Sequence, residues 1–239
     1  MRTWGQRMES RGRTAFGREL QIAIGDESIA GTLAVPGEAA ALVLFAHGSG
    51  SSRFSGRNRF VSDFLNRSGI ATLLLDLLTS REAQTDAFTA QFRFDIDLLA
   101  SRLAQATLSC AEREDLQGLP LGYFGASTGA AAALIAAVES PVSIGAIVSR
   151  SGRPDLAWHV LPSISAPTLL IVGGNDPEVI ELNRQAFGRL QAPKALEIVP
   201  GATHLFEEPG TLERVAELAR DWFLGHLKKV PMRQAGTAP

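Results

Sequence analysis

The sequence has 239 residues, one cysteine and a formal net charge of −2 at pH 7, and 45% of its residues are hydrophobic. A single cysteine excludes a disulfide-stapled scaffold and a cysteine-rich zinc site. The near-neutral charge argues against a nucleic-acid partner that needs a basic surface. The longest apolar runs, residues 39–46 and 130–138, are far shorter than the ~18–20 residues of a membrane span. The composition therefore predicts a globular protein that binds neither nucleic acid nor membrane.

The two ends differ in pattern from the rest of the chain. Residues 1–18 contain five arginines but no apolar central stretch of the kind that secretory signals have. We therefore expect a cytoplasmic protein with a flexible arm over residues 1–18, a single domain over residues 19–228 and a loose tail over residues 229–239. The sequence is compatible with a homodimer but does not predict one.

Strand and helix patterns alternate through the predicted domain. Residues 21–24 and 29–35 predict two antiparallel strands around a turn at Gly25. Continuous apolar runs follow, as in strands buried on both faces of a sheet, over residues 41–46, 71–75, 121–124, 144–148, 168–172 and 195–199. Helical periodicity lies between them, over residues 57–67, 94–108, 128–138, 178–190 and 212–227. This alternation predicts an α/β fold with a mostly parallel sheet flanked by helices.

Functional groups of a parallel sheet gather at the carboxyl ends of its strands, so the residues after each run are the candidates. A Gly-rich loop, residues 47–52, follows the first parallel strand. Ser127 follows a later strand within Gly-x-Ser-x-Gly, the pattern of a nucleophile elbow when a strand precedes it and a helix follows. Asp176 and His204 follow the last two strands. The chain order Ser, Asp, His thus predicts a catalytic triad.

Each triad residue has a defined predicted role and an alternative. Ser127 would be the nucleophile, His204 its base, and Asp176 the acid that orients His204. Ser127 could instead be a helix N-cap in a tight turn, and Asp176 could be an N-cap before Pro177. Other acids, Asp155, Glu207 and Glu208, are weaker candidates for the role of Asp176.

The oxyanion of an acyl-transfer reaction needs two fixed donors. The backbone N–H of Thr128, the residue after the nucleophile, is one candidate. The other is the N–H of Ser49 in the Gly-rich loop, with Gly48 as a weaker choice. The chain shows no P-loop, no dinucleotide-binding glycine motif and no metal-ligand spacing, so we expect no cofactor and no metal.

Several side chains near the predicted strand ends are candidates for substrate binding. Arg53, Arg57 and Arg150 could hold a carboxylate or phosphate as a bidentate pair, and Phe206 could line the pocket. Surface ion pairs and core packing are the alternatives for these residues. Only residues 149–166 separate the sixth predicted strand from the seventh, with room for one short helix near residues 156–161. Without a sizeable lid, the site should favour small, water-soluble esters.

The strand-end motifs from His47-Gly48-Ser49-Gly50 to Gly201-Ala202-Thr203-His204 resemble those of the α/β-hydrolase superfamily, and within it the dienelactone hydrolase-like family. The resemblance covers about residues 20–227. It implies an eight-stranded, mostly parallel sheet whose second strand is antiparallel, and cofactor-free hydrolysis through an acyl-enzyme. Dienelactone hydrolases proper use a cysteine where this sequence has Ser127, so the resemblance is closer to serine carboxylesterases. Similar proteins also occur fused to a phosphoribosyltransferase domain, which we do not expect here.

The favoured function is hydrolysis of small carboxylic esters. Thioester, lactone or amide hydrolysis by the same triad is an alternative, because leaving-group preference depends on pocket shape. A non-catalytic protein that binds a small molecule on the hydrolase scaffold is an alternative of a different class.

Overall fold

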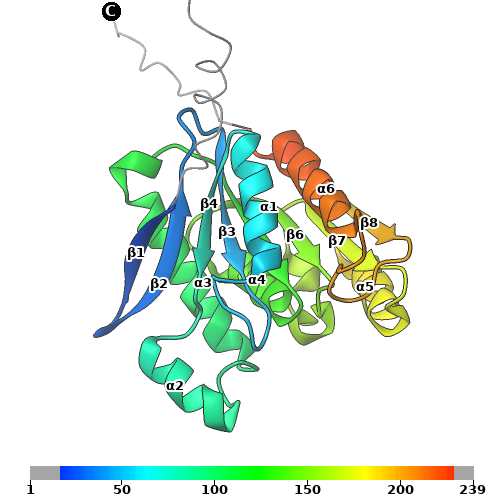
Figure 1. Cartoon of the computed structure of the whole chain (residues 1–239), viewed down its shortest axis with the longest axis horizontal. Coiled ribbons are helices and arrows are strands. Elements are labelled where there is room, and N and C mark those ends of the chain that lie inside the picture. The colour runs from blue at the N-terminus through cyan, green and yellow to red at the C-terminus, as the bar shows by residue number, and fades with distance from the viewer. Residues whose placement is uncertain (1–16, 229–239) are drawn as a thin grey trace, which may run out of the picture.

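The computed structural model describes residues 17–228, which form one eight-stranded sheet with helices on both faces (Figure 1). The strand order is β1-β2-β4-β3-β5-β6-β7-β8. Strand β2 (Glu27–Ala34) runs antiparallel to β1 (Arg18–Ile24) and β4 (Ile70–Leu75), and all other neighbours are parallel. The remaining strands are β3 (Ala41–Ala46), β5 (Leu121–Ala126), β6 (Ile144–Arg150), β7 (Thr168–Gly173) and β8 (Lys194–Val199).

The helices form two layers (Figure 1). Helices α1 (Gly56–Arg67) and α6 (Thr211–His226) cover one face of the sheet. The opposite face is covered by α3 (Ile96–Ala111), α4 (Thr128–Glu139) and α5 (Pro177–Arg189). Helix α2 (Ser80–Thr89) follows β4 and projects beyond the end of the sheet (Figure 1). Three short 3-10 turns complete the described part, at Glu114–Leu116, Pro154–Ala157 and Leu161–Ser163.

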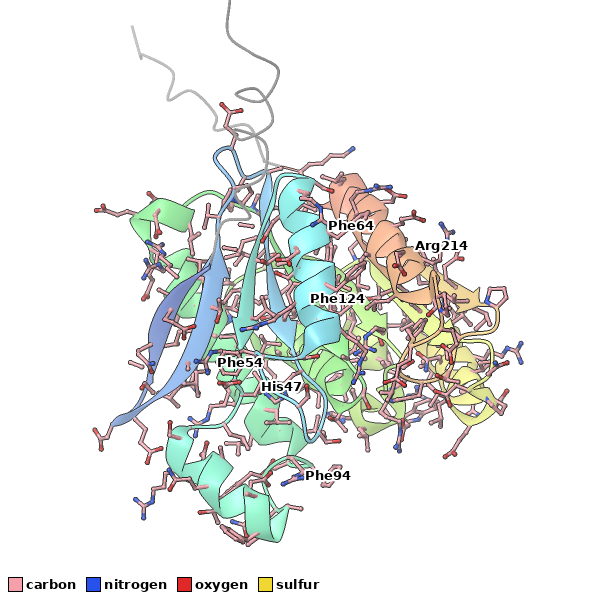
Figure 2. All side chains as sticks on the ribbon, in the orientation of Figure 1. His47, Phe54, Phe64, Phe94, Phe124 and Arg214 are labelled. Carbon is pink, nitrogen blue, oxygen red and sulfur yellow. The ribbon has the colours of Figure 1, made fainter. Side chains whose placement is uncertain are left out.

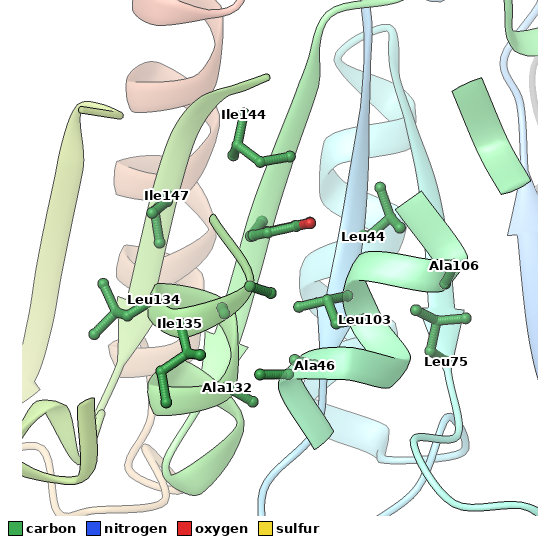
Figure 3. Packing of buried hydrophobic residues seen from close by; sticks show 14 of the residues in the cluster. Leu44, Ala46, Leu75, Leu103, Ala106, Ala132, Leu134, Ile135, Ile144 and Ile147 are labelled. Carbon is green, nitrogen blue, oxygen red and sulfur yellow. The ribbon is translucent and has the colours of Figure 1, made fainter. Parts of the chain in front are cut away.

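The central strands are buried on both faces, which is why they are apolar at every position. In β3, for example, Leu42, Leu44 and Ala46 pack against α3 and α4, as Figure 3 shows for Leu44 and Ala46. The alternate residues Val43 and Phe45 pack on the side of α1 and α6. The sheet therefore separates two hydrophobic layers and is fixed from both sides.

The fold agrees with the α/β-hydrolase architecture that the sequence predicts. All eight strands and five of the predicted helices are present, with boundaries shifted by a few residues. Strand β8 differs from the expectation of two-sided burial, because it lies at the sheet edge and is mostly half-buried. Two 3-10 turns, Pro154–Ala157 and Leu161–Ser163, replace the short helix expected near residues 156–161.

Helix α2 was not predicted, because only Asp86 of its ten residues is buried and no apolar stripe marks it. Its start nevertheless carries a signal in the sequence. Thr79 and Glu82 form a capping box, in which the Thr79 hydroxyl accepts from the Glu82 N–H and the Glu82 carboxylate accepts from the Thr79 N–H. Local capping, with little burial, therefore defines this helix.

Residues 1–16 of the predicted arm and the whole predicted tail lie outside the described residues, and Arg18 belongs to β1 and not to the arm. Among residues 17–228, no helix has both the length and the apolar character that crossing a membrane requires.

Helix α3 provides a direct test of the packing. Leu103 is fully buried against the sheet (Figure 3), whereas Leu108 on the same helix is 40% exposed. We expect Leu103→Ala to lower the free energy of unfolding by about 2–5 kcal/mol, because it leaves a cavity in the core. Leu108→Ala should change it by less than about 1 kcal/mol. Urea unfolding followed by circular dichroism measures both, and equal losses would contradict the observed orientation of α3.

Candidate active site

Ser127 lies in a tight turn between β5 and α4, with backbone angles φ 52° and ψ −120°. A non-glycine residue seldom adopts such angles, because its Cβ then crowds the backbone. The turn is tight because two neighbouring segments approach it closely. A Cβ on Gly125 would lie 2.4 Å from Ala130 Cα, and one on Gly129 would lie 2.4 Å from Ala46 O. The two glycines of Gly-x-Ser-x-Gly are thus required by backbone contacts.

The structure brings together the three side chains that the sequence places at separate strand ends. His204 Nε2 lies 3.3 Å from Ser127 Oγ, and His204 Nδ1 lies 2.7 Å from Asp176 Oδ2. Ser127 follows β5, Asp176 follows β7 and His204 follows β8, so the parallel sheet delivers all three to one edge. Both hydrogen bonds connect side chains that are at least 28 positions apart in the chain.

Ser127 and Asp176 could each cap the helix that follows them, as the sequence allows, but their side chains do not do so. Both residues occupy N-cap positions, Ser127 at α4 and Asp176 at α5, and Pro177 is the first residue of α5. Neither side chain makes a capping hydrogen bond. Their oxygens instead point to His204, which leaves each helix end without the stabilisation that a capping serine or aspartate usually gives.

The other candidate acids are engaged elsewhere. Asp155 pairs with Arg153 at 2.7 Å, and Glu207 pairs with Arg57 at 3.2 Å. Glu208 accepts a hydrogen bond from the Thr203 N–H at 3.0 Å. Asp176 is the acid that reaches His204.

The Gly-rich loop after β3 passes directly beside the serine turn. The Ser49 N–H donates to Thr128 Oγ1 at 2.8 Å, so this predicted oxyanion donor is hydrogen-bonded to a hydroxyl in the free protein. His47 anchors the loop at the ends of β3 and β4 (Figure 2), since its Nδ1 is 3.0 Å from Gly48 O and its Nε2 accepts from the Leu77 N–H at 3.3 Å. Burial lowers the pKa of His47 below its usual value, so the ring is neutral and structural.

A cavity of about 270 Å³ opens beside Ser127 and His204. Of the predicted binding residues, Arg57 and Arg150 line it. No aspartate or glutamate is among its lining residues, which are Gly48, Ser49, Ser51, Ser55, Arg57, Asn58, Ala126, Ser127, Arg150, Ser151, His204 and Leu205. The serine therefore faces a small polar cavity whose fixed charges are positive.

Two predicted binding residues lie elsewhere. Arg53 is held by ion pairs with Asp76 and with Glu19, and it lines a separate cavity on the α1 side of β2 and β4. Phe206 is only 1% exposed and packs in the core, with its backbone at φ 55°. Its predicted place in the cavity is taken by Leu205, which is 39% exposed. Position after a strand indicates proximity to the site, but it does not give the direction of a side chain.

Two further residues line the cavity but are not predicted from the sequence, Asn58 and Ser151. Asn58 lies one residue beyond Arg57 in the first turn of α1, and Ser151 lies one residue beyond Arg150. Neither carries a motif that marks it in the sequence. Within residues 17–228, no group of three His, Cys, Asp or Glu side chains is arranged to hold a metal ion.

Comparison with known proteins identifies the family. A dienelactone hydrolase from Anabaena variabilis is 53% identical to this chain, with a TM-score of 0.87, over 89% of this chain and 98% of that one. The chain belongs to the dienelactone hydrolase family of α/β-hydrolases. The fold alone is shared with more distant structures, such as an esterase from Pyrococcus furiosus at 17% identity, with a TM-score of 0.72 over 95% and 96% of the two chains.

Two curated relatives carry a different name. They are proteins from two strains of Mycobacterium tuberculosis, each named "Putative phosphoribosyl transferase", and each is 56% identical to this chain over 209 residues. The match covers 87% of this dienelactone hydrolase family member but 46% of each relative, so the chain spans about half their length. No family model matches the chain.

Two substitutions that both remove the Ser127 hydroxyl test whether the backbone of this turn is strained. At φ 52° a glycine is free of the Cβ contacts that an alanine makes, so Ser127→Gly should be more stable than Ser127→Ala by about 1 kcal/mol. Ser101 in α3 is the control, because at an exposed helical site alanine should be the more stable by about 1 kcal/mol. Denaturant unfolding measures both pairs. If Ser127→Ala is also more stable than Ser127→Gly, the turn is unstrained.

Proposed function

We propose that this protein is a serine hydrolase that cleaves small, soluble carboxylic esters through an acyl-enzyme on Ser127. The observation that supports the proposal most strongly is the pair of hydrogen bonds that joins Ser127 Oγ, the His204 ring and Asp176. A serine hydroxyl is a weak nucleophile until a base accepts its proton, and His204 Nε2 is within reach of that proton.

The proposed reaction has two halves. Ser127 Oγ attacks the ester carbonyl while His204 Nε2 takes the hydroxyl proton, and His204 then returns this proton to the departing alcohol. Water next attacks the acyl-serine with His204 again as base, which releases the carboxylic acid and restores the serine hydroxyl. Asp176 stays ionised, fixes the ring orientation and stabilises the imidazolium in both halves.

The oxyanion would form at the N-terminus of α4. The Thr128 N–H is the first proposed donor, and the helix dipole adds positive potential there. The Ser49 N–H is the second, although it donates to the Thr128 hydroxyl in the free protein. Substrate binding would therefore require the Ser49 N–H to share its hydrogen bond between this hydroxyl and the oxyanion.

The size of the site favours small substrates. The cavity beside Ser127 measures about 270 Å³, and the segment between β6 and β7 forms only two short 3-10 turns and no lid. A lactone is the second candidate substrate, because a relative at 53% identity is named a dienelactone hydrolase. Thioesters and amides would be cleaved by the same steps. A non-catalytic binding role is the remaining alternative, and it would not need the alignment of Ser127, His204 and Asp176.

The transferase name of the Mycobacterium tuberculosis relatives does not change this proposal. We propose that it describes the part of those proteins that this chain does not match.

Hydrolysis of 4-nitrophenyl acetate and butyrate tests the proposed function. We expect wild-type protein to hydrolyse both esters. Ser127→Ala and His204→Gln should each lower kcat by about 10³-fold or more. Asp176→Asn should lower kcat by a comparable factor, because the amide no longer holds the His204 tautomer.

Asp155→Asn is the matched control for Asp176→Asn. Asp155 is also an acid after a central strand, but it pairs with Arg153 and not with His204. Its substitution should leave kcat within about threefold of wild type. An inactive wild-type protein, or equal losses in the two aspartate variants, would contradict the proposed roles.

A further inference from the structure

Arg150 is a buried cation without a partner. The residue is 6% exposed, its Nε is buried without a hydrogen-bond partner, and within residues 17–228 its side chain makes no ion pair. Its guanidinium carbon lies 6.0 Å from the centre of the Phe206 ring, so an aromatic ring is among its neighbours. Burial, and to a lesser degree the charge of Arg57, lowers the pKa of Arg150 to about 10, so it is still charged at neutral pH. A buried, uncompensated charge is strongly unfavourable for stability.

A second cation faces the same cavity. Arg57 lies in the first turn of α1 and lines the cavity together with the N-cap residue Ser55. Among the described residues it pairs with Glu207 alone, whose side chain is largely exposed, and an exposed pair of this kind is weak. The Arg57 Nε is buried and has no partner. Two arginines thus share the cavity, and no acid that lines it balances them.

The start of α1 adds to the positive potential. Helices usually carry acidic residues in their first turn, where the backbone N–H groups point outward and the dipole is positive. The first turn of α1 has no acidic residue and instead contains Arg57 and Arg59. No acidic side chain in this first turn therefore offsets the positive potential of the helix end at the cavity.

Within the part of the chain that the structure describes, two neutral polar groups at the same place also have no partner. Ser151 has a buried hydroxyl with no hydrogen bond and a backbone at φ 43°, although it is not glycine. Asn58 has a buried side-chain oxygen with no hydrogen bond. Both residues line the cavity beside the two arginines. Strained backbone and unpaired buried polar atoms are typical of ligand sites, where a bound group satisfies them.

This end of the cavity is fixed relative to the serine. The Ser127 N–H donates to Arg150 O at 3.1 Å, and the Arg153 N–H donates to Ser127 O at 3.2 Å. The segment that carries Arg150 and Ser151 is therefore bonded on both sides to the backbone of the proposed nucleophile. A group held by Arg150 would lie in the same small cavity as an ester at Ser127.

We propose that Arg150 and Arg57, assisted by Ser151 and Asn58, form a subsite for an anionic group, a carboxylate or a phosphate, on the ester substrate. This inference rests on the proposed function, because it assigns the class of ester that the serine site prefers. Arginine binds either anion through paired, charge-assisted hydrogen bonds. The subsite selects substrates by charge and takes no part in bond cleavage.

Two pairs of esters test the subsite. 4-Acetoxybenzoate and its methyl ester differ by a negative charge on the leaving group. The 4-nitrophenyl monoester of adipic acid and its methyl ester differ by the same charge on the acyl group. The kcat/KM of each ester is divided by its rate of alkaline hydrolysis, which removes the difference in intrinsic reactivity. We expect wild type to prefer one charged ester over its neutral partner by about tenfold or more.

The arginine variants then locate the subsite. Arg150→Met keeps the length of the side chain without the charge, and it should lower the charged-to-neutral ratio by about tenfold or more. Arg57→Gln should lower it in the same direction. Arg59→Gln is the matched control, because Arg59 belongs to the same turn of α1 but lines the separate cavity that Arg53 also lines. The proposal is overturned if wild type shows no preference for either charged ester, or if Arg150→Met keeps the wild-type ratio.

Ligand-induced shifts in Tm separate this inference from the proposed function and distinguish the two anions. Inorganic phosphate and benzoate should each be tested as stabilisers of wild type, Arg57→Gln and Arg59→Gln. If no ester is hydrolysed, the proposed function fails, but a shift that Arg57→Gln removes and Arg59→Gln keeps still supports the anion subsite. No shift with either anion, in a protein that also shows no charge preference, overturns it. Arg57 is partly exposed, so its variant serves if Arg150→Met does not fold.

Discussion

The serine turn depends on a backbone approach that leaves no room for a side chain. Gly129 lies against the carbonyl oxygens of Ala46 and His47, and Gly125 lies against the first turn of α4. This contact holds the Ser127 segment against the end of β3, so the position of Ser127 relative to the Gly-rich loop is fixed. The Ser49 hydrogen bond to the Thr128 hydroxyl closes the same junction. The parallel sheet then determines that Asp176 and His204 arrive at this edge.

The charged side chains around Ser127 lie in two separate groups. On one side, the His204 ring contacts both Asp176 and the Ser127 hydroxyl, which is the geometry for accepting a proton from the serine. On the other side, Arg150 and Arg57 face a cavity that no acid lines. Stability alone would favour an apolar residue at position 150 over an unpaired cation. The proposed anion subsite would account for this charge, which folding alone does not favour.

Much of this arrangement could be predicted from the sequence, because it depends on local patterns. Continuous apolar runs predict the strands. The Gly-x-Ser-x-Gly pattern between a strand and a helix predicts the turn at Ser127. The direction of single side chains could not be predicted, since it depends on neighbours that are distant in the chain. Arg53 follows a strand end as Arg57 does, but Asp76 and Glu19 hold it away from the serine. Likewise, Phe206 turns into the core, and its neighbour Leu205 faces the cavity.

The most direct test of the account is the site of covalent labelling by a fluorophosphonate. The reagent reacts with a serine hydroxyl only when a neighbouring base activates it. Wild-type protein should gain the mass of one adduct, and peptide mapping should place it on Ser127, with slow or absent labelling in His204→Gln. An adduct on a different serine, or no adduct in a protein that hydrolyses 4-nitrophenyl acetate, would contradict the assignment of Ser127 as the nucleophile.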